Sequence, residues 1–248
     1  SITDSLVWTY NKNIVSRAEL AMMAVIANNN WKRPVYFTIT VPDDNYMGLD
    51  RYLVSEGFAL RLMPVDMGIK EGGGRALIDP AAVYNNVLNK FKWGNIANAS
   101  YIDPDSYRYI SLYVGSIYGD AISRLEAQGK MAEAKNLALD AYKNMPKRVY
   151  GMPETLSYWT VIEALYKTGE KQKADEILSR NLKFIKENIA YYQAIAETKP
   201  DLEGRNIQYG FYALSRYKDI LATQGNNPLA KEVDGLINQL TQQYHIQQ

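Results

Sequence analysis

The chain has 248 residues, of which 47% are apolar and 22% are charged, a composition typical of folded globular proteins. Its 28 basic and 27 acidic residues give a net charge of +1, so the sequence offers no concentrated basic surface for a nucleic-acid partner. Cysteine is absent and His245 is the single histidine, which excludes disulfides, thiolate chemistry and multi-histidine metal sites. We expect His245 to be a solvated tail residue, and we expect no metal or cofactor.

The first hundred residues predict a small α/β region. Apolar residues at helical spacing predict a first helix that ends at a cluster of asparagines. A second helix is expected to stop at Gly57, and a second strand to close at Pro64. Two strands alone bury too little surface to be stable, so we expect them to pack on other parts of the protein. In chain order the expected helix, strand, helix and strand cover 13–27, 35–41, 46–56 and 58–65.

Three consecutive glycines at 72–74 lie within an expected loop over 66–78. A phosphate-binding loop of the Walker type would continue into Gly-Lys-Ser/Thr and a helix, and neither pattern is complete here. The glycines therefore predict a flexible surface loop. Asp79 and Pro80 then have the residue types of a helix N-cap and first helical position, so a helix is expected to begin there.

From about residue 105 the sequence predicts helices almost throughout, and it contains a repeat. A glycine is followed five residues later by an alanine in three places: Gly129/Ala134, Gly169/Ala174 and Gly225/Ala230. Glycine permits the left-handed turn between two antiparallel helices, and alanine lets the helices approach closely. This pattern resembles the tetratricopeptide repeat, although the glycines are spaced by 40 and 56 residues instead of the regular 34. Longer helices or inserted loops must fill the difference.

These patterns predict a mainly α fold with a small α/β N-terminal part. Tetratricopeptide-like antiparallel helix pairs, an α-α superhelix, are expected in the C-terminal part. We place the two domains at 1–100 and 101–248. Pro146 is expected to end the first repeat, and the segment from Asn181 to Arg205 is the main expected insertion.

The segment WKRPVYF at 31–37 and the segment GFALRLMP at 57–64 carry a second resemblance. Together they resemble a group of large bacterial integral-membrane proteins whose N-terminal region is similar to protein O-mannosyltransferases. The resemblance covers about residues 10–66. It implies that the chain is the soluble C-terminal region that follows the last membrane span, on the extracytoplasmic (periplasmic) face. Catalytic acids of such families lie near the first membrane spans, so the resemblance transfers no catalytic residue to this sequence.

One cluster of cations and aromatic rings in the α/β part is the candidate ligand-binding site. A ring could stack on a glycan or lipid-phosphate headgroup, and a guanidinium could make bidentate contacts with it. The alternative is structural: Trp31 would cover the core beneath the strand, and Arg33 would pair with a nearby acid. The candidates are Trp31, Lys32, Arg33, Tyr36, Arg51 and Arg61.

Two other groups of side chains have residue types that occur in binding sites. The acidic pairs Asp43-Asp44 and Asp103/Asp105 lack the longer ligand series of a calcium loop, and the second pair has the pattern of a helix start. The repeat could instead present a concave surface to a protein partner. Some of the tyrosines on its opening helix are expected to be exposed: Tyr107, Tyr109, Tyr113 and Tyr118.

The function expected from the sequence is a non-catalytic, extracytoplasmic accessory or interaction domain of a glycosyltransferase-like membrane protein. Its expected partners are the membrane part of the same polypeptide and a protein, glycan or lipid-phosphate ligand. A free-standing tetratricopeptide-like adaptor is the first alternative. An enzyme that acts on carbohydrate through two carboxylates is the second.

Overall fold

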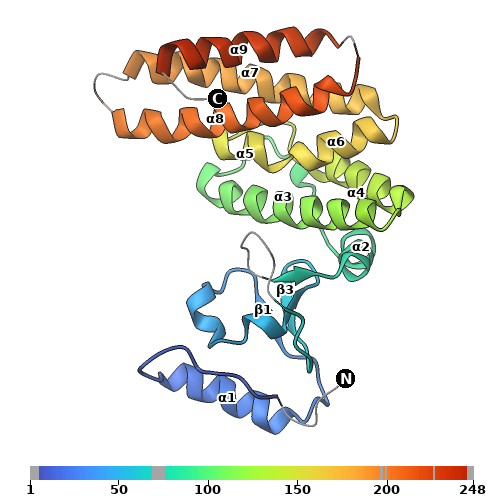
Figure 1. Cartoon of the computed structure of the whole chain (residues 1–248), viewed down its shortest axis with the longest axis vertical. Coiled ribbons are helices and arrows are strands. Elements are labelled where there is room, and N and C mark those ends of the chain that lie inside the picture. The colour runs from blue at the N-terminus through green and yellow to red at the C-terminus, as the bar shows by residue number, and fades with distance from the viewer. Residues whose placement is uncertain (1–5, 69–75, 196–197, 199, 226, 245–248) are drawn as a thin grey trace. The chain divides into compact units, whose positions relative to one another are not determined.

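The computed structural model describes residues 6–68, 76–195, 198, 200–225 and 227–244. The chain divides into two compact units, residues 1–91 and residues 92–248, which we call the N-terminal unit and the helical unit. The described residues are mainly helical with one small sheet near the N-terminus, which confirms the predicted fold class (Figure 1). Gly72, Gly73, Gly74 and His245 lie outside the described residues, so the expectations for them stay predictions.

The N-terminal unit begins with an extended segment and the helix α1 (Arg17–Asn29). The helix starts four residues later than predicted because Ser16 caps it. The Ser16 hydroxyl accepts from the Glu19 amide, and the Glu19 carboxylate accepts from the Ser16 amide. The helix ends at the asparagine cluster as predicted, with Asn30 in the left-handed conformation at φ 45°.

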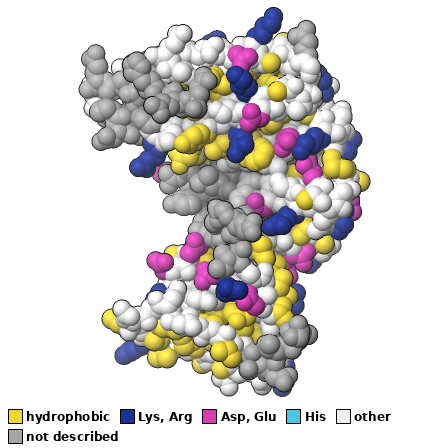
Figure 2. Space-filling model, viewed as in Figure 1, with side chains coloured by type: hydrophobic (Ala, Val, Ile, Leu, Met, Phe, Trp, Pro, Cys, Tyr) yellow, Lys and Arg dark blue, Asp and Glu magenta, His cyan; other side chains and the backbone are white. Residues whose placement is uncertain are grey.

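The sheet of this unit has four short strands in the order β1-β3-β2-β4. Strand β3 pairs antiparallel with both β1 and β2, and β2 pairs parallel with β4. The side chains buried around the sheet include Phe37, Leu53, Leu60 and Leu62. Hydrophobic side chains nevertheless remain visible on the surface of the unit (Figure 2). The strands are β1 (Tyr36–Thr38), β2 (Leu53–Ser55), β3 (Ala59–Leu62) and β4 (Leu77–Ile78).

The prediction of a helix over 46–56 is wrong. Two 3₁₀ turns, η1 (Asp43–Tyr46) and η2 (Asp50–Tyr52), lead into strand β2 instead. Between them Met47 and Gly48 have positive φ values of 58° and 83°, which an α-helix cannot accommodate. A Cβ at Gly48 would lie 2.3 Å from the Thr9 carbonyl oxygen, so the N-terminal segment requires a glycine there.

Gly57 therefore ends no helix and lies in the turn between β2 and β3. Its φ is 119°, and a Cβ would lie 2.8 Å from the ring of Phe91. The two predicted strands exist but are shorter than expected, because only three and four of their residues join the sheet. The helix predicted from Pro80 is confirmed as α2 (Pro80–Asn89), and the Asp79 carboxylate accepts from the amides of Ala81 and Ala82.

The helical unit begins with the 3₁₀ turn η3 (Ile96–Asn98) and continues as a stack of antiparallel helix pairs (Figure 1). The first pair is α3 with α4, the last is α8 with α9, and the middle pair joins α5 and α6 to α7. A break at Tyr158 separates α5 from α6. The helices are α3 (Pro104–Ala127), α4 (Met131–Asn144), α5 (Met152–Ser157), α6 (Trp159–Lys167), α7 (Lys171–Ile195), α8 (Pro200–Ala222) and α9 (Pro228–Tyr244).

The three repeated glycines each occupy a turn between paired helices, with φ values of 73°, 82° and 66°. The first two turns share one type of backbone hydrogen bond, in which the residue after the glycine donates to the last turn of the preceding helix. Lys130 N donates to Leu125 O at 2.9 Å, and Glu170 N donates to Leu165 O at 2.8 Å. Ala134 and Ala174 are fully buried after them. The third turn differs, since its alanine, Ala230, is only half-buried. The helix pairs are thus confirmed, while kinship with tetratricopeptide proteins stays a prediction.

Longer helices fill the larger spacing of the glycines. Helix α7 continues through Asn181 to Ile195, and α8 begins at Pro200, so most of the expected insertion is helical. Helix α4 ends at Asn144, just before Pro146, where the first repeat was expected to end. Asp103 caps α3 by accepting from the Ser106 amide at 2.9 Å, as its helix-start pattern predicts.

Candidate functional site

An open groove of about 670 Å³ crosses one face of the helical unit, and we call it the groove. Its walls come from three places in the sequence: the middle of α3, the region of α5 and the start of α6, and the beginning of α8. It is lined by Gly115, Ser116, Gly119, Asp120, Ser123, Pro153, Leu156, Ser157, Trp159, Thr160, Arg205, Asn206 and Tyr209.

Two glycines of α3 allow the groove to form. A Cβ at Gly115 would lie 2.7 Å from the Ser157 Cβ and 2.8 Å from its carbonyl oxygen. A Cβ at Gly119 would lie 3.1 Å from the Thr160 hydroxyl. Helix α3 therefore lies against the α5–α6 region at backbone distance, and larger side chains would push the two walls apart.

The polar residues of α3 reach the groove because of their spacing. Ser116, Asp120 and Ser123 are at i, i+4 and i+7, so they lie on one face of the helix.

On α8, Tyr212 and Arg216 follow Tyr209 at i+3 and i+7 and extend the face that begins in the groove. Tyr212 is 49% exposed and accepts a hydrogen bond from Gln208 at 3.0 Å.

Trp159 is held in place from the α8 side. The Arg216 guanidinium lies 5.1 Å from the centre of the Trp159 ring, within the range of a cation–π contact. The groove thus combines aromatic rings with hydroxyl, amide, carboxylate and guanidinium groups. Asp120 and Arg205 contribute opposite charges to the described lining, so the site is suited to ligands that have both donors and acceptors.

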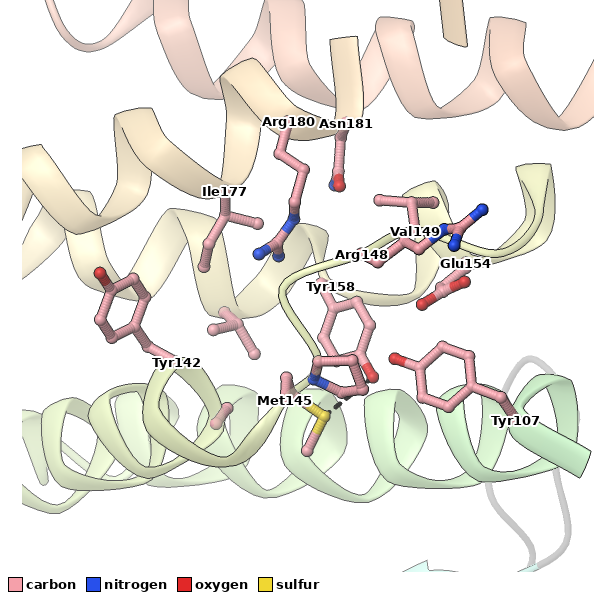
Figure 3. Close-up of a pocket in the computed structure, with 13 residues that line it drawn as sticks. Tyr107, Tyr142, Met145, Arg148, Val149, Glu154, Tyr158, Ile177, Arg180 and Asn181 are labelled. Atoms are coloured by element: carbon pink, nitrogen blue, oxygen red, sulfur yellow. Dashed lines mark hydrogen bonds between the residues drawn. The ribbon is translucent and has the colours of Figure 1, made fainter. Parts of the chain in front are cut away.

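A second, much smaller cavity of about 20 Å³ lies inside the helical unit (Figure 3). It has room for about one water molecule. Glu154 lies beside it and accepts from the amides of Tyr150 and Gly151 at 2.8 and 3.2 Å. Burial raises the pKa of Glu154 to about 7, although these amides, the Tyr107 hydroxyl and Arg180 favour the charged form.

The surroundings of Glu154 indicate a structural role. Tyr107 and Tyr158 are buried next to it with their hydroxyls close together (Figure 3), and the Tyr158 hydroxyl is 3.0 Å from the Met145 sulfur. Arg180 extends from α7 towards the same cavity, where its buried Nε has no hydrogen-bond partner among the described residues. These contacts fix the start of α5, and α5 is one wall of the groove.

Of the six ligand-binding candidates predicted from the sequence, the structure brings two together. Tyr36 and Arg61 are cross-strand neighbours, and both contact the Glu56 carboxylate. The Tyr36 hydroxyl donates to it at 3.0 Å, and the Arg61 guanidinium donates to it at 3.2 Å. Burial and the Glu56 carboxylate raise the pKa of Tyr36. Arg51 instead binds both oxygens of Asp66. It therefore forms a separate ion pair.

The other three predicted residues lie in the turn after α1. Trp31 has a positive φ of 55° and is 44% exposed, so it does not cover the core beneath the strand. Lys32 and Arg33 are exposed. Among the described residues no acid forms an ion pair with Arg33, and its carbonyl accepts from the Asn29 side chain at 2.6 Å. Whether any of the six binds a ligand stays a prediction.

Sequence reasoning missed the groove because its walls are up to 94 positions apart, from Gly115 to Tyr209. The tyrosines expected on α3 proved a poor guide. Tyr107 and Tyr118 are buried, and the side chains of Tyr109 and Tyr113 lie outside the described residues. The usable signal was the polar spacing of Ser116, Asp120 and Ser123 in a helix that also carries small glycines.

A family model is similar to the first part of the chain. Residues 1–80 match the TMEM260-associated domain 2. The matched stretch contains α1, all four strands and the candidate cluster at Trp31, while the groove lies outside it. The chain gives no significant match to a curated protein or to a solved structure. Among the described helices, none is long and apolar enough to span a bilayer, and no described cluster of three or more metal-ligating side chains could hold an ion.

Proposed function

We propose that this chain is a non-catalytic, extracytoplasmic binding module of a membrane protein that is similar to protein O-mannosyltransferases. In this proposal the groove of the helical unit binds an extended polypeptide segment. The observation that carries the binding role is the open groove, with rings, charges and hydroxyls on three walls.

The membrane context is supported by the N-terminal unit. The family model that matches residues 1–80 is described as a domain associated with TMEM260, a membrane protein similar to protein O-mannosyltransferases. The resemblance of WKRPVYF and GFALRLMP to such proteins points in the same direction. An accessory module next to a glycosyl-transfer centre could hold an acceptor or a partner protein.

An extended peptide fits the groove on chemical grounds. A peptide backbone presents alternating donors and acceptors, and the groove offers donors from Arg205 and acceptors from Asp120 as well as groups that do both. The Trp159 and Tyr209 rings can cover apolar side chains of such a segment while their polar atoms stay hydrated. Stacked helix pairs commonly use an open face of this kind for partners.

The binding role is tested by selection from a displayed library of random 12-residue peptides against the whole chain. Selected peptides should bind the unaltered protein, and Arg205→Glu with Tyr209→Ala should weaken binding at least ten-fold, because both residues line the groove. Tyr191→Ala is the matched control, since Tyr191 is 56% exposed and lies outside the groove lining. Peptides that bind all variants equally, or selection of none, would contradict the proposal. Groove-dependent binding of oligosaccharides in place of peptides would contradict its polypeptide part.

The membrane role is tested in the natural gene. Membrane spans encoded upstream in the same reading frame are expected. Membrane glycosyl transfer by the full protein should fall when the groove carries Arg205→Glu and Tyr209→Ala, with unchanged amounts of protein in the membrane. Full transfer by that variant would argue against a role in the reaction.

A free-standing adaptor is the second candidate, and the groove supports it equally well because the groove does not depend on a membrane parent. The two functions differ in the upstream gene. A reading frame that encodes no membrane span, combined with groove-dependent peptide binding, would favour the adaptor.

A further inference from the structure

Helix α1 exposes several of its apolar residues and buries a charged one, while Met22, Met23 and Ile26 are half-buried. Its one buried side chain is Glu19, which is 5% exposed, whereas Leu20 and Val25 are 56% and 60% exposed. A helix at the surface of a globular protein normally turns its apolar stripe towards the core. The outward face of α1 consists largely of Leu20, Ala21, Ala24, Val25 and Ala27, and these residues are all exposed.

The orientation of α1 is fixed by the contacts of Glu19. Its carboxylate accepts from the Lys12 ammonium at 2.8 Å and from the Ser16 amide at 2.7 Å. Together these bonds lower the pKa of Glu19 to about 2. Rotating the helix to bury Leu20 would break them and expose the cap. The apolar face is therefore held outward by the fold.

The residues around α1 enlarge this exposed apolar surface. In the segment before the helix, Val7 is 75%, Ile14 is 81% and Val15 is 41% exposed, and Trp31 follows the helix. We call residues 6–33 the α1 surface. Exposed apolar residues gathered in one segment of a soluble unit are typical of an interaction site.

The α1 surface is also positively charged. Residues 6–33 contain four basic residues and one acidic residue, whereas 34–91 contain five basic and seven acidic residues. Lys12 is neutralised by Glu19. Among the described residues, Arg17, Lys32 and Arg33 form no ion pair. These three unpaired cations lie at the start of α1 and just after its end.

We infer that the α1 surface docks on an anionic lipid bilayer, with Leu20 and Val25 entering the interface and the cations contacting lipid phosphates. Apolar residues combined with basic residues and a tryptophan are what such surfaces require. Tryptophan is favoured at the boundary between headgroups and acyl chains. A second copy of this chain would instead bring like charges together. This inference goes beyond the proposed function, because the groove can bind its ligand without a lipid contact.

Vesicle sedimentation with the whole chain tests this inference. The chain should bind vesicles of 70% phosphatidylcholine and 30% phosphatidylglycerol, bind pure phosphatidylcholine weakly, and dissociate as salt rises. Lys32→Gln with Arg33→Gln should lower partitioning about 30-fold, taking about 1 kcal/mol for each basic residue. Leu20→Ser with Val25→Ser should also reduce binding, and Tyr191→Ser in the helical unit is the matched control.

Several outcomes would overturn the inference. Equal binding to neutral and anionic vesicles, or binding unchanged in both double variants, would exclude docking through this surface. A dimer in sedimentation equilibrium that Leu20→Ser with Val25→Ser abolishes, without vesicle binding, would assign the surface to a second copy. If the serine variant fails to fold, the glutamine variant and the salt dependence still decide. Peptide binding by the groove should be unchanged in all these variants, so failure of one proposal is distinguishable from failure of the other.

Discussion

The two units of this chain differ in how they treat their apolar side chains. Of the thirteen large hydrophobic residues that are exposed in the described part of the chain, nine lie between Val7 and Met67 in the N-terminal unit, although that unit is the smaller one. The helical unit buries its apolar residues between paired helices, as at Leu137, Leu165 and Leu178. The helix pairs thus form a core of their own, whereas the N-terminal unit, with strands of two to four residues, leaves apolar surface exposed.

The largest expected effect compares the same truncation in the two units. Leu178→Ala removes a fully buried side chain from α7 and should lower the free energy of unfolding by about 2–5 kcal/mol. Leu20→Ala in α1 should change it by less than about 0.5 kcal/mol, because Leu20 is mostly exposed. Urea unfolding followed by circular dichroism and tryptophan fluorescence measures both. Similar losses would show that α1 is packed in solution.

Glu154 in the helical unit and Glu19 in the N-terminal unit should make the stability of the two units depend on pH in opposite directions. Glu154 has a folded pKa of about 7, above its ordinary value, so it is protonated more readily in the folded state. The helical unit should therefore lose stability as pH rises from about 4.5 to 7, by at most about 3 kcal/mol. Thermal unfolding across this range should show the loss, and Glu154→Gln should remove it.

Glu19 acts with the opposite sign in the N-terminal unit. Its folded pKa is lowered to about 2 by Lys12 and Ser16, so its stabilising effect is present above the ordinary pKa. That effect should be lost as pH falls from about 4.5 to 2. Glu19→Gln is the control, because this variant should not show the loss of stability between pH 4.5 and 2. A Glu154→Gln variant that keeps the slope between pH 4.5 and 7 would assign that slope to other groups.

Substitutions of two helical glycines distinguish the effect of close helix packing on stability from the effect of helix propensity. Gly115→Val should destabilise by about 1–3 kcal/mol and reduce peptide binding by the groove, because its Cβ meets Ser157. Gly235→Ala in α9 is the matched control, since a Cβ there meets nothing within 4 Å. It should be neutral or stabilise by up to about 1 kcal/mol. Equal effects at the two positions would contradict the close approach of α3.

The smallest expected effect concerns surface ion pairs. Arg51→Gln breaks the pair with Asp66, in which both side chains are about half exposed, and should cost no more than about 0.5 kcal/mol. Lys135→Gln in the helical unit should cost slightly more, because Lys135 bonds to both Glu170 and the Thr168 carbonyl. Chemical denaturation of the two variants side by side measures the difference. A larger cost at Arg51 would show that the N-terminal unit depends on this pair.

Sequence patterns predicted the elements that rest on local chemistry. Asp79 and Asp103 signal helix starts, and the repeated glycines signal the turns between helices, because capping and left-handed turns depend on neighbouring residues alone. Strands β2 and β4 were missed because two or three residues are too few to show an alternating pattern. The apolar spacing at Leu49 and Leu53 suits a helix equally well. The close approach of Gly48 to Thr9, which excludes a side chain there, is a contact between segments far apart in the sequence.

The groove could not be read from the sequence for a different reason. Each wall looks like an ordinary solvated helix face when taken alone. Only the packing of α3 on α5–α6, and of α5 on α8, brings Asp120, Trp159 and Arg205 around one space. The candidate cluster in the N-terminal unit shows the converse, since residues close in sequence such as Arg51 and Arg61 bind different acids.

Tyr217 has a consequence for the thermodynamics of binding. It is fully buried in α8, donates to the Thr155 carbonyl of α5, and accepts from Asn181 of α7 at 2.8 Å. Two walls of the groove are thus joined through the core, so the width of the groove is set before a ligand arrives. A ligand then loses mainly its own conformational entropy on binding. A stiff, proline-containing segment should therefore bind more tightly than a glycine-rich segment with the same contacts.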